Sequence, residues 1–277
     1  MCGIVGYVGK NKEARDVVIK GLRRLEYRGY DSAGIAVKLQ NSTSRVIRAV
    51  GGVDNLYDAL PEDLESGSIA IGHTRWATHG EPAERNAHPH TSMNGVITLV
   101  HNGIIENYET LKKKLITEGY TFESDTDTEV LANWIEYIYY KVYSAESCGL
   151  AEIVHTALKD IVGAYAILVV DMYSNDVVMA KKSSPLAIGI GVDEFIIASD
   201  ATPIIEYTKD IIYLEDDQLG VIENQTNLRI IDLNAIEVDP VVEKVEMELD
   251  QLEKGGYDSF MLKEIHEQPT VVRNALQ

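Results

Sequence analysis

Short apolar runs dominate the second half of the chain. Between residues 164 and 233 these runs are rich in β-branched side chains and are separated by only a few turn residues. Such runs are typical of β-strands, and their close spacing favours antiparallel pairing through tight turns. Similar runs occur among the Gly-, His- and Asn-rich segments of the first half. The pattern predicts strands at 2–9, 33–39, 46–51, 68–73, 95–101, 164–172, 177–182, 186–192, 194–199, 211–215, 219–224 and 228–233.

Four segments follow a helical period instead. In the first segment, residues 12–25, Val18, Leu22 and Leu25 fall near one face, which suits an amphipathic helix. In the third, Thr126 and Glu129 have the spacing of a capping box, which favours a helix start. Sheets that carry helices on their outer faces form a layered α+β domain. The predicted helices are 12–25, 105–118, 126–143 and 150–160.

The texture of the chain changes near residue 241. The remaining segment is polar and is interrupted by Gly255-Gly256 and by Pro269. We therefore expect one domain over residues 1–240, followed by a connector over 241–277 that stops inside a helical stretch. A connector of this kind predicts a further domain beyond residue 277.

Charge and cysteine content limit the possible functions. The chain has 25 Lys and Arg residues against 44 Asp and Glu residues, a net charge of −19. An acidic surface repels phosphate backbones, which argues against nucleic-acid binding. No run of eighteen apolar residues occurs, and the N-terminus lacks the basic region of a signal peptide. Two cysteines, Cys2 and Cys148, make no disulfide framework, so we expect a reduced, cytoplasmic setting.

Cys2 directly follows the initiator methionine. Its small side chain favours removal of Met1, which would leave a thiol and a free α-amine on the same carbon. An α-amine has a reference pKa of about 7.7–8.0, so a useful fraction is unprotonated near neutral pH. This amine can accept the thiol proton without any histidine, which makes Cys2 a candidate nucleophile. The alternative is an inert cysteine that opens a strand.

Asn102 and Gly103 are candidates for an oxyanion hole. They follow the apolar run 95–100 and precede a predicted helix. An Asn amide and the next backbone N–H can converge on one oxygen, and glycine permits the backbone geometry that this requires. The alternative is an Asn-Gly turn at the end of the strand.

Arg75 and Asp127 could hold the two charges of an amino acid. Arg75 follows an apolar strand, and its guanidinium can bind a carboxylate through two hydrogen bonds. Asp127 lies in the first turn of a predicted helix, where the helix dipole alone would explain a carboxylate. Neighbouring Thr78 and His79 could bind substrate or merely shape the loop, and Trp76 could pack or act as a gate. The alternative for Arg75 is an ordinary surface arginine.

A metal or nucleotide cofactor is not expected. The histidines at 73, 79, 88, 90 and 101 match no strong zinc-ligand spacing. The chain has neither a Walker loop nor a GxGxxG motif.

Several segments together resemble one family. MCGIVGYVG, LRRLEYRGYDSAGIAV, GHTRWATHG, NAHPH, HNGIIENY and SDTDTEV are similar to the glutaminase domain of the glutamine–fructose-6-phosphate aminotransferases. The resemblance covers essentially the whole chain. SFMLKEIHEQP, at 259–269, resembles the connector of that family into its sugar-isomerase half.

Two related families share this kind of nucleophile. Amidophosphoribosyltransferases usually carry Gln-Glu where this chain has Tyr30-Asp31, and they lack the tryptophan found here at position 76. Asparagine synthetases have an Arg-Gly-Pro turn where this chain has Arg28-Gly29-Tyr30. Neither family has the connector at 259–269, so the aminotransferases are preferred.

The resemblance implies the four-layer αββα sandwich of N-terminal-nucleophile hydrolases. It makes Cys2 the nucleophile, and it makes Asn102 and Gly103 the oxyanion hole. Arg28 and Gly29 would order the N-terminus and the substrate pocket.

The same resemblance implies the substrate contacts and the partners. Arg75 would bind the carboxylate of glutamine and Asp127 its amine, while Thr78 and His79 complete the pocket. Trp76 would gate the path of ammonia toward a sugar-isomerase half of the same polypeptide, which makes glucosamine-6-phosphate. A homo-oligomer is expected at full length.

Two other functions were weighed. A non-catalytic domain that senses glutamine would keep Arg75 and Asp127 but would need neither Cys2 nor Asn102. Another N-terminal-nucleophile hydrolase, such as an acylase, would lack paired charges for both ends of an amino acid.

Overall fold

The computed structural model describes residues 2–39, 43–77, 80–141, 148–232, 234–246, 257 and 260–275. Two compact units are present, residues 1–244 and residues 245–277. Each is described by itself.

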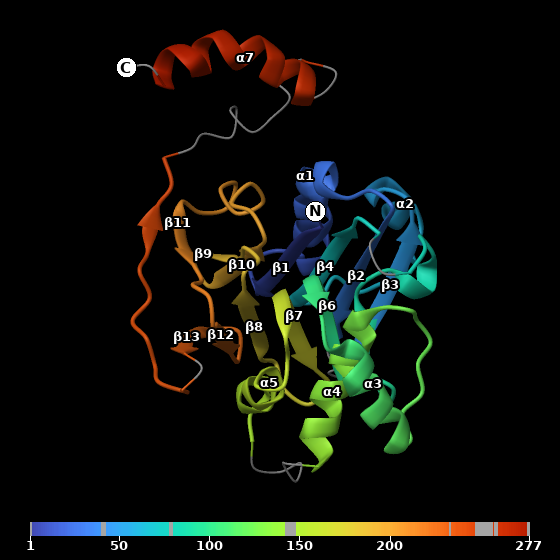
Figure 1. The fold of residues 1–277 in the computed structure, drawn as a ribbon. Helices are drawn as coiled ribbons and strands as arrows, with labels where there is room; N and C mark the ends of the chain where they lie inside the picture. The colour runs from blue at the N-terminus through green and yellow to red at the C-terminus, as the bar shows by residue number, and fades with distance from the viewer. Residues whose placement is uncertain are drawn as a thin grey trace. The chain divides into compact units, whose positions relative to one another are not determined.

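Two antiparallel sheets form the centre of the first unit (Figure 1). The larger sheet has the order β14-β11-β9-β10-β1-β4-β2-β3, and the smaller sheet has the order β13-β12-β8-β7-β6-β5. Strand β1 therefore lies inside the larger sheet, paired with β10 on one side and β4 on the other. The strands are β1 Gly3–Gly9, β2 Ser32–Lys38, β3 Ser44–Val50, β4 Ile69–Arg75, β5 His90–Thr91, β6 Ile97–Ile105, β7 Gly163–Asp171, β8 Val177–Lys182, β9 Ala187–Ile190, β10 Glu194–Ala198, β11 Asp210–Tyr213, β12 Gln218–Glu223, β13 Asn227–Asp232 and β14 Glu243–Lys244.

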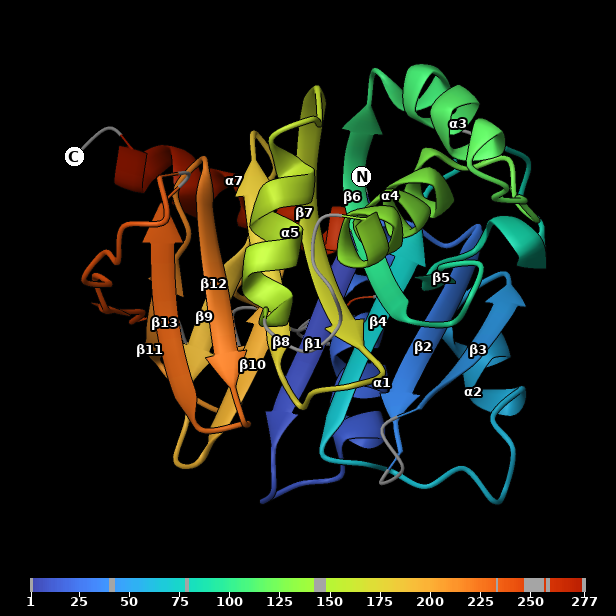
Figure 2. The same ribbon diagram turned by 90° about the horizontal axis from the view of Figure 1, so that it is seen from below.

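Helices cover the outer face of each sheet. Helix α1 packs on β1 and β4 of the larger sheet, and α4 packs on β5 and β6 of the smaller one. Figure 2 shows α4 and α5 in front of the smaller sheet and α1 behind the larger sheet. The expected αββα order of layers is therefore confirmed. The helices of this unit are α1 Ala14–Leu25, α2 Val53–Asp58, α3 Tyr108–Thr117, α4 Asp127–Lys141 and α5 Leu150–Leu158, with short 3-10 turns η1 Glu26–Arg28 and η2 Glu84–Asn86.

Two apolar layers hold these elements together. The layer between the sheets includes Ile4 and Ile71 from the larger sheet and Leu168 from the smaller sheet, all buried. The layer beneath the smaller sheet joins Leu99 to Trp134 of α4. Because the central strands of both sheets are buried on both faces, they read as nearly continuous apolar runs rather than alternating ones.

The capping box of α4 forms only in part. The backbone N–H of Glu129 donates to Thr126 Oγ1 at 3.2 Å, as the spacing predicts. The Glu129 carboxylate instead accepts from the backbone N–H groups of Glu123 and Ser124, at 2.8 and 2.7 Å. The loop before α4 is thereby fixed to the first turn of the helix.

Two sequence-based boundaries were wrong. Strand β6 does not end near residue 101, because it stays paired with β7 through Ile105 and Gly163. The following helix accordingly begins at Tyr108 rather than at 105. Asn102 and Gly103 therefore lie inside a strand, and the turn at the strand end is excluded. Helix α2 and strands β5 and β14 were not anticipated.

The second unit contains helix α7, Phe260–Ala275, which continues through Pro269. The first unit ends at Lys244, where β14 pairs with β11. In the described part of the chain, no helix is long and apolar enough to cross a membrane.

Candidate active site

Cys2 stands immediately before β1, where hydrogen bonding to two neighbouring strands fixes the backbone. Its half-buried Sγ accepts the backbone N–H of Trp76 at 3.3 Å. Burial raises the pKa of the Cys2 thiol, although the Trp76 N–H and the charge of Arg75 oppose that shift. Within the described residues, the hydrogen bonds of Sγ go to the Trp76 backbone and to no histidine. No imidazole in the described part of the chain is therefore placed to accept the thiol proton directly.

Asn102 reaches Cys2 from the other sheet. Strand β6 lies against both β1 and β4 across the interface between the sheets. The Asn102 Nδ2 donates to the backbone carbonyl of Cys2 at 3.1 Å, while its Oδ1 faces His73 Nε2 at 2.9 Å. The amide group is therefore held at both ends, with its NH₂ toward Cys2.

Gly103 has a conformation that other residues rarely adopt. Its φ is +135°, and a Cβ at this position would lie 2.0 Å from the carbonyl oxygen of Ala164. A side chain is thus excluded by both the backbone and the neighbouring strand. This explains in physical terms why glycine follows Asn102.

The end of β4 carries Arg75, which is buried. Its guanidinium donates to the backbone carbonyls of Gly80 at 3.1 Å and Glu81 at 3.3 Å. Gly29 lies directly against this point, since a Cβ there would be 2.7 Å from the backbone of Arg75 and Trp76. The close approach of Gly29 helps to shape the pocket.

Asp127 begins α4 and is buried. Its Oδ2 accepts the backbone N–H of Ile105 at 2.8 Å, which ties the start of the helix to the end of β6. Burial of Arg75 has the largest effect on the pKa of its guanidinium and lowers that pKa. The negative charge of Asp127 attracts the guanidinium and raises its pKa by a smaller amount. A positive and a negative side chain thus face the same site.

One small cavity brings Cys2, Gly103, Arg75 and Asp127 together, whereas its lining does not include Asn102 or Gly29. It has a volume of about 20 Å³, which is enough for a water molecule but too small for an amino acid. A larger cavity of about 620 Å³ is lined by residues that include Gly9 and Lys38. It lies at the opposite end of β1 from Cys2. We place the site at the smaller cavity because its lining holds the reactive and charged groups. Its lining is Cys2, Arg75, Trp76, His88, His101, Gly103, Thr126, Asp127 and Thr128.

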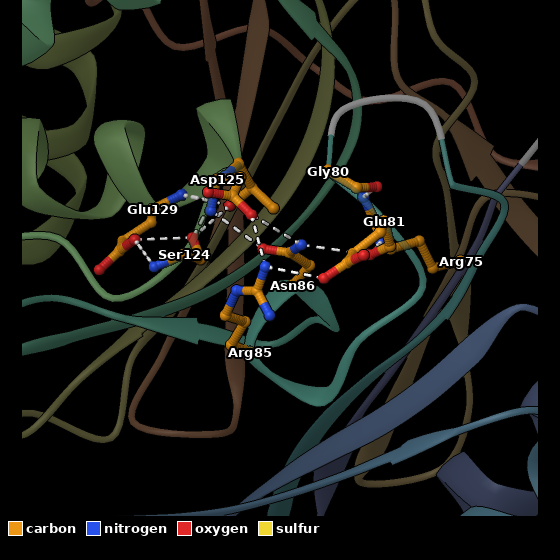
Figure 3. Close-up of polar contacts among 9 residues, drawn as sticks. Arg75, Gly80, Glu81, Arg85, Asn86, Ser124, Asp125 and Glu129 are labelled. Carbon is orange, nitrogen blue, oxygen red and sulfur yellow. Dashed lines mark hydrogen bonds and ion pairs between the residues drawn. The ribbon is translucent and has the colours of Figure 1, made fainter.

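A hydrogen-bond network joins the two sides of the site (Figure 3). The Asn86 side chain donates to the carbonyl of Glu81 and to the carboxylate of Asp125, both at 3.2 Å, and accepts the Asp125 N–H. Arg85 forms ion pairs with the carboxylates of Glu81 and Asp125. The segment that contacts Arg75 is thereby linked to the loop that precedes Asp127.

The remaining expected residues are placed as follows. Arg28 forms an ion pair with Asp200 at 2.5 Å and contacts the carbonyl of Ser199, whose backbone N–H donates to Ile4. It therefore supports the start of β1 without lining the cavity. Trp76 is 44% exposed and packs edge-on against Tyr30. Thr78 and His79 lie outside the described residues.

Sequence reasoning gave no role to the buried histidines near Cys2. His73 and His88 stack with ring centroids 4.2 Å apart, and both rings are buried. His73 is two residues before Arg75 on β4, so both side chains point to the same face of the strand. That spacing is the signal that could have identified His73. Among the described residues, no cluster of His, Cys, Asp or Glu could hold a metal ion.

The chain is similar to known proteins. Residues 73–206 match a family model for a glutamine amidotransferase domain. The whole chain is 51% identical to a glutamine–fructose-6-phosphate aminotransferase of Bacteroides thetaiotaomicron, and 46% identical to one of Chlorobaculum tepidum. The chain spans 44% and 45% of the lengths of these two relatives.

A solved structure supports the fold. The glutamine phosphoribosylpyrophosphate amidotransferase of B. subtilis, complexed with ADP and GMP, is similar with a TM-score of 0.70 and 26% identity. The similarity covers 84% of this chain and 49% of that one. The expected sandwich of the N-terminal-nucleophile hydrolases is thereby confirmed. The chain therefore carries a glutamine amidotransferase domain, and all of it is similar to the N-terminal half of the glutamine–fructose-6-phosphate aminotransferases.

Proposed function

We propose that this chain hydrolyses glutamine to glutamate and ammonia, with Cys2 as the nucleophile. The observation that carries the proposal is the convergence of Cys2, Gly103, Arg75 and Asp127 on one cavity. These residues come from different elements: Cys2 precedes β1, Arg75 ends β4, Gly103 lies inside β6 and Asp127 begins α4. A nucleophile, an oxyanion donor and two opposite charges are the groups that hydrolysis of an amino-acid amide requires.

The chemistry begins with the α-amine that removal of Met1 exposes on Cys2. This amine takes the thiol proton, and Sγ attacks the amide carbon of the glutamine side chain. The oxyanion that forms accepts hydrogen bonds from Asn102 Nδ2 and the Gly103 N–H. The carbon–nitrogen bond then breaks, and the amine returns its proton to the departing ammonia. Water hydrolyses the γ-glutamyl thioester, which releases glutamate and restores the thiol.

The other residues of the site bind the α-carboxylate and the α-amine of glutamine. Arg75 binds the α-carboxylate through its guanidinium, in exchange for carbonyls that it contacts in the free site. Asp127 binds the α-amine. Thr78 and His79 complete this pocket.

The ammonia is destined for fructose-6-phosphate in a longer protein. Relatives with that activity in their names are more than twice as long as this chain. In this proposal, residues 1–240 are the glutaminase domain, and residues 241–277 connect it to a sugar-isomerase half. The half-exposed Trp76 ring gates the exit of ammonia, and the full-length protein is a cytoplasmic homo-oligomer.

A glutaminase assay tests the proposal. The chain with Met1 removed should release glutamate and ammonia from glutamine, and Cys2→Ala should abolish release while still binding glutamine. Glutamine binding without turnover in the processed chain would refute hydrolysis and favour the sensing function.

A further inference from the structure

His73 has no part in the chemistry proposed above, yet it contacts an oxyanion donor. It is fully buried on β4, and its Nε2 lies 2.9 Å from Oδ1 of Asn102. We propose that His73 is a positioning residue whose Nε2–H fixes the Asn102 amide with its NH₂ toward the oxyanion. This inference rests on the proposed function, because it assigns a role within the same site.

The two ends of the Asn102 amide are not interchangeable here. In the observed orientation, Nδ2 donates to the Cys2 carbonyl and Oδ1 faces a ring nitrogen of His73. Rotation of the amide by half a turn would bring Oδ1 against the Cys2 carbonyl, so that two acceptors would face each other. The same rotation would turn the donor away from the position of the oxyanion. Catalysis therefore depends on what holds Oδ1 in place.

The protonation state of His73 decides whether it can hold Oδ1. Burial lowers the pKa of His73 to about 3, and the contact with Asn102 opposes that shift only in part. The ring is therefore neutral near neutral pH and carries one N–H. Its Nδ1 makes no well-aligned hydrogen bond within the described residues, although the backbone of His101 lies close enough to the ring to raise its pKa. A proton on Nδ1 would leave a buried donor poorly satisfied and would set the Nε2 lone pair against Oδ1. A proton on Nε2 avoids both penalties.

Neighbouring histidines keep the His73 ring in this position. The ring stacks on His88, and Nδ1 of His88 in turn accepts the backbone N–H of His101 at 3.4 Å. His88 must therefore be unprotonated at Nδ1, and burial lowers its pKa, with a further contribution from the positive charge of Arg75. His101 contacts Thr128 at the start of α4. The imidazoles thus form a buried, neutral layer that carries no charge into the oxyanion hole.

A double-mutant cycle separates positioning from packing. His73→Gln keeps an N–H the same number of bonds from Cα, whereas His73→Met has a similar length and no donor. We expect His73→Met to lower kcat about tenfold with little change in KM, and His73→Gln to recover most of that loss. In an Asn102→Ala background, His73→Met should change kcat less than about twofold. Equal losses in the Gln and Met variants, or the full loss in both backgrounds, would overturn the inference.

A second measurement needs neither a substituted protein nor catalytic turnover. Side-chain ¹⁵N NMR of the processed chain should show His73 protonated at Nε2 and unprotonated at Nδ1 between about pH 5 and 8. A proton on Nδ1, or titration of His73 in that range, would overturn the inference. Failure of the parent chain to hydrolyse glutamine would instead refute the proposed function, and the NMR result would still decide the role of His73.

Discussion

Replacing Asp127 by asparagine removes one charge and almost nothing else. Asparagine keeps the size of the side chain and an oxygen that can accept the Ile105 N–H. In the parent chain the Ile105 nitrogen lies 2.8 Å from Asp127 Oδ2. What is lost is the charge that faces the site beside Arg75. A charge-assisted hydrogen bond contributes about 1.5–3 kcal/mol, so the Kd for glutamine should rise about 10- to 150-fold.

The effect on folding should be small by comparison. A carboxylate in the first turn of a helix stabilises it by about 0.3–1 kcal/mol, so Tm should fall by no more than about 4 °C. Glu152→Gln is a matched control, because Glu152 is an exposed carboxylate in the first turn of α5, away from the cavity. It should show a similar change in Tm with an unchanged Kd.

Calorimetry on a Cys2→Ala background measures this Kd without turnover. A glutamine analogue that lacks the α-amine should bind the Asp127→Asn variant and its parent equally well. An affinity for glutamine within about threefold of the parent would show that Asp127 serves only the helix start. Equal weakening of the amine-free analogue would point to a distorted pocket instead of a lost charge.

The other predictions concern the nucleophile, the oxyanion hole and the acceptor. Chain that retains Met1 should be inactive, and mass analysis of active protein should show Cys2 as its first residue; full activity with Met1 present would exclude the α-amine as base. Asn102→Ala should lower kcat about 10²–10³-fold with KM little altered, after normalisation to folded protein by thermal melt; a kcat within about threefold of the parent would exclude the oxyanion role. Gly103→Ala should cost about 1–3 kcal/mol of stability through backbone strain, more still through its contact with Ala164, and a melt with unchanged Tm would contradict that reasoning. This chain, given glutamine and fructose-6-phosphate, should yield no glucosamine-6-phosphate. Detection of that sugar by mass spectrometry would place the acceptor site within this chain.

The regular elements were predictable because burial on both faces makes their strands strongly apolar. The boundaries near residue 102 were not, because a polar Asn-Gly pair within a strand reads locally as a turn. What keeps Gly103 in β6 is its pairing with Tyr165 of β7, a contact between distant parts of the chain. The candidate site followed from motifs. The spacing of His73 and Arg75 could place His73 on the same face of its strand, but its contact with Asn102 joins strands of different sheets and could not be predicted from either segment alone. Short strands such as β5 lack enough residues to give a period.

The position of β1 inside the larger sheet has a consequence for how such proteins can be extended. Chain termini usually fray, but β1 is hydrogen-bonded along both edges by β10 and β4. The backbone beside Cys2 therefore loses its conformational entropy, about 1–2 kcal/mol per residue, when the protein folds and not during turnover. In the proposed mechanism the active chain begins at Cys2, so an affinity tag or an added domain in front of Cys2 would block its α-amine. Fusion is restricted to the C-terminal side, where the longer relatives carry their additional length.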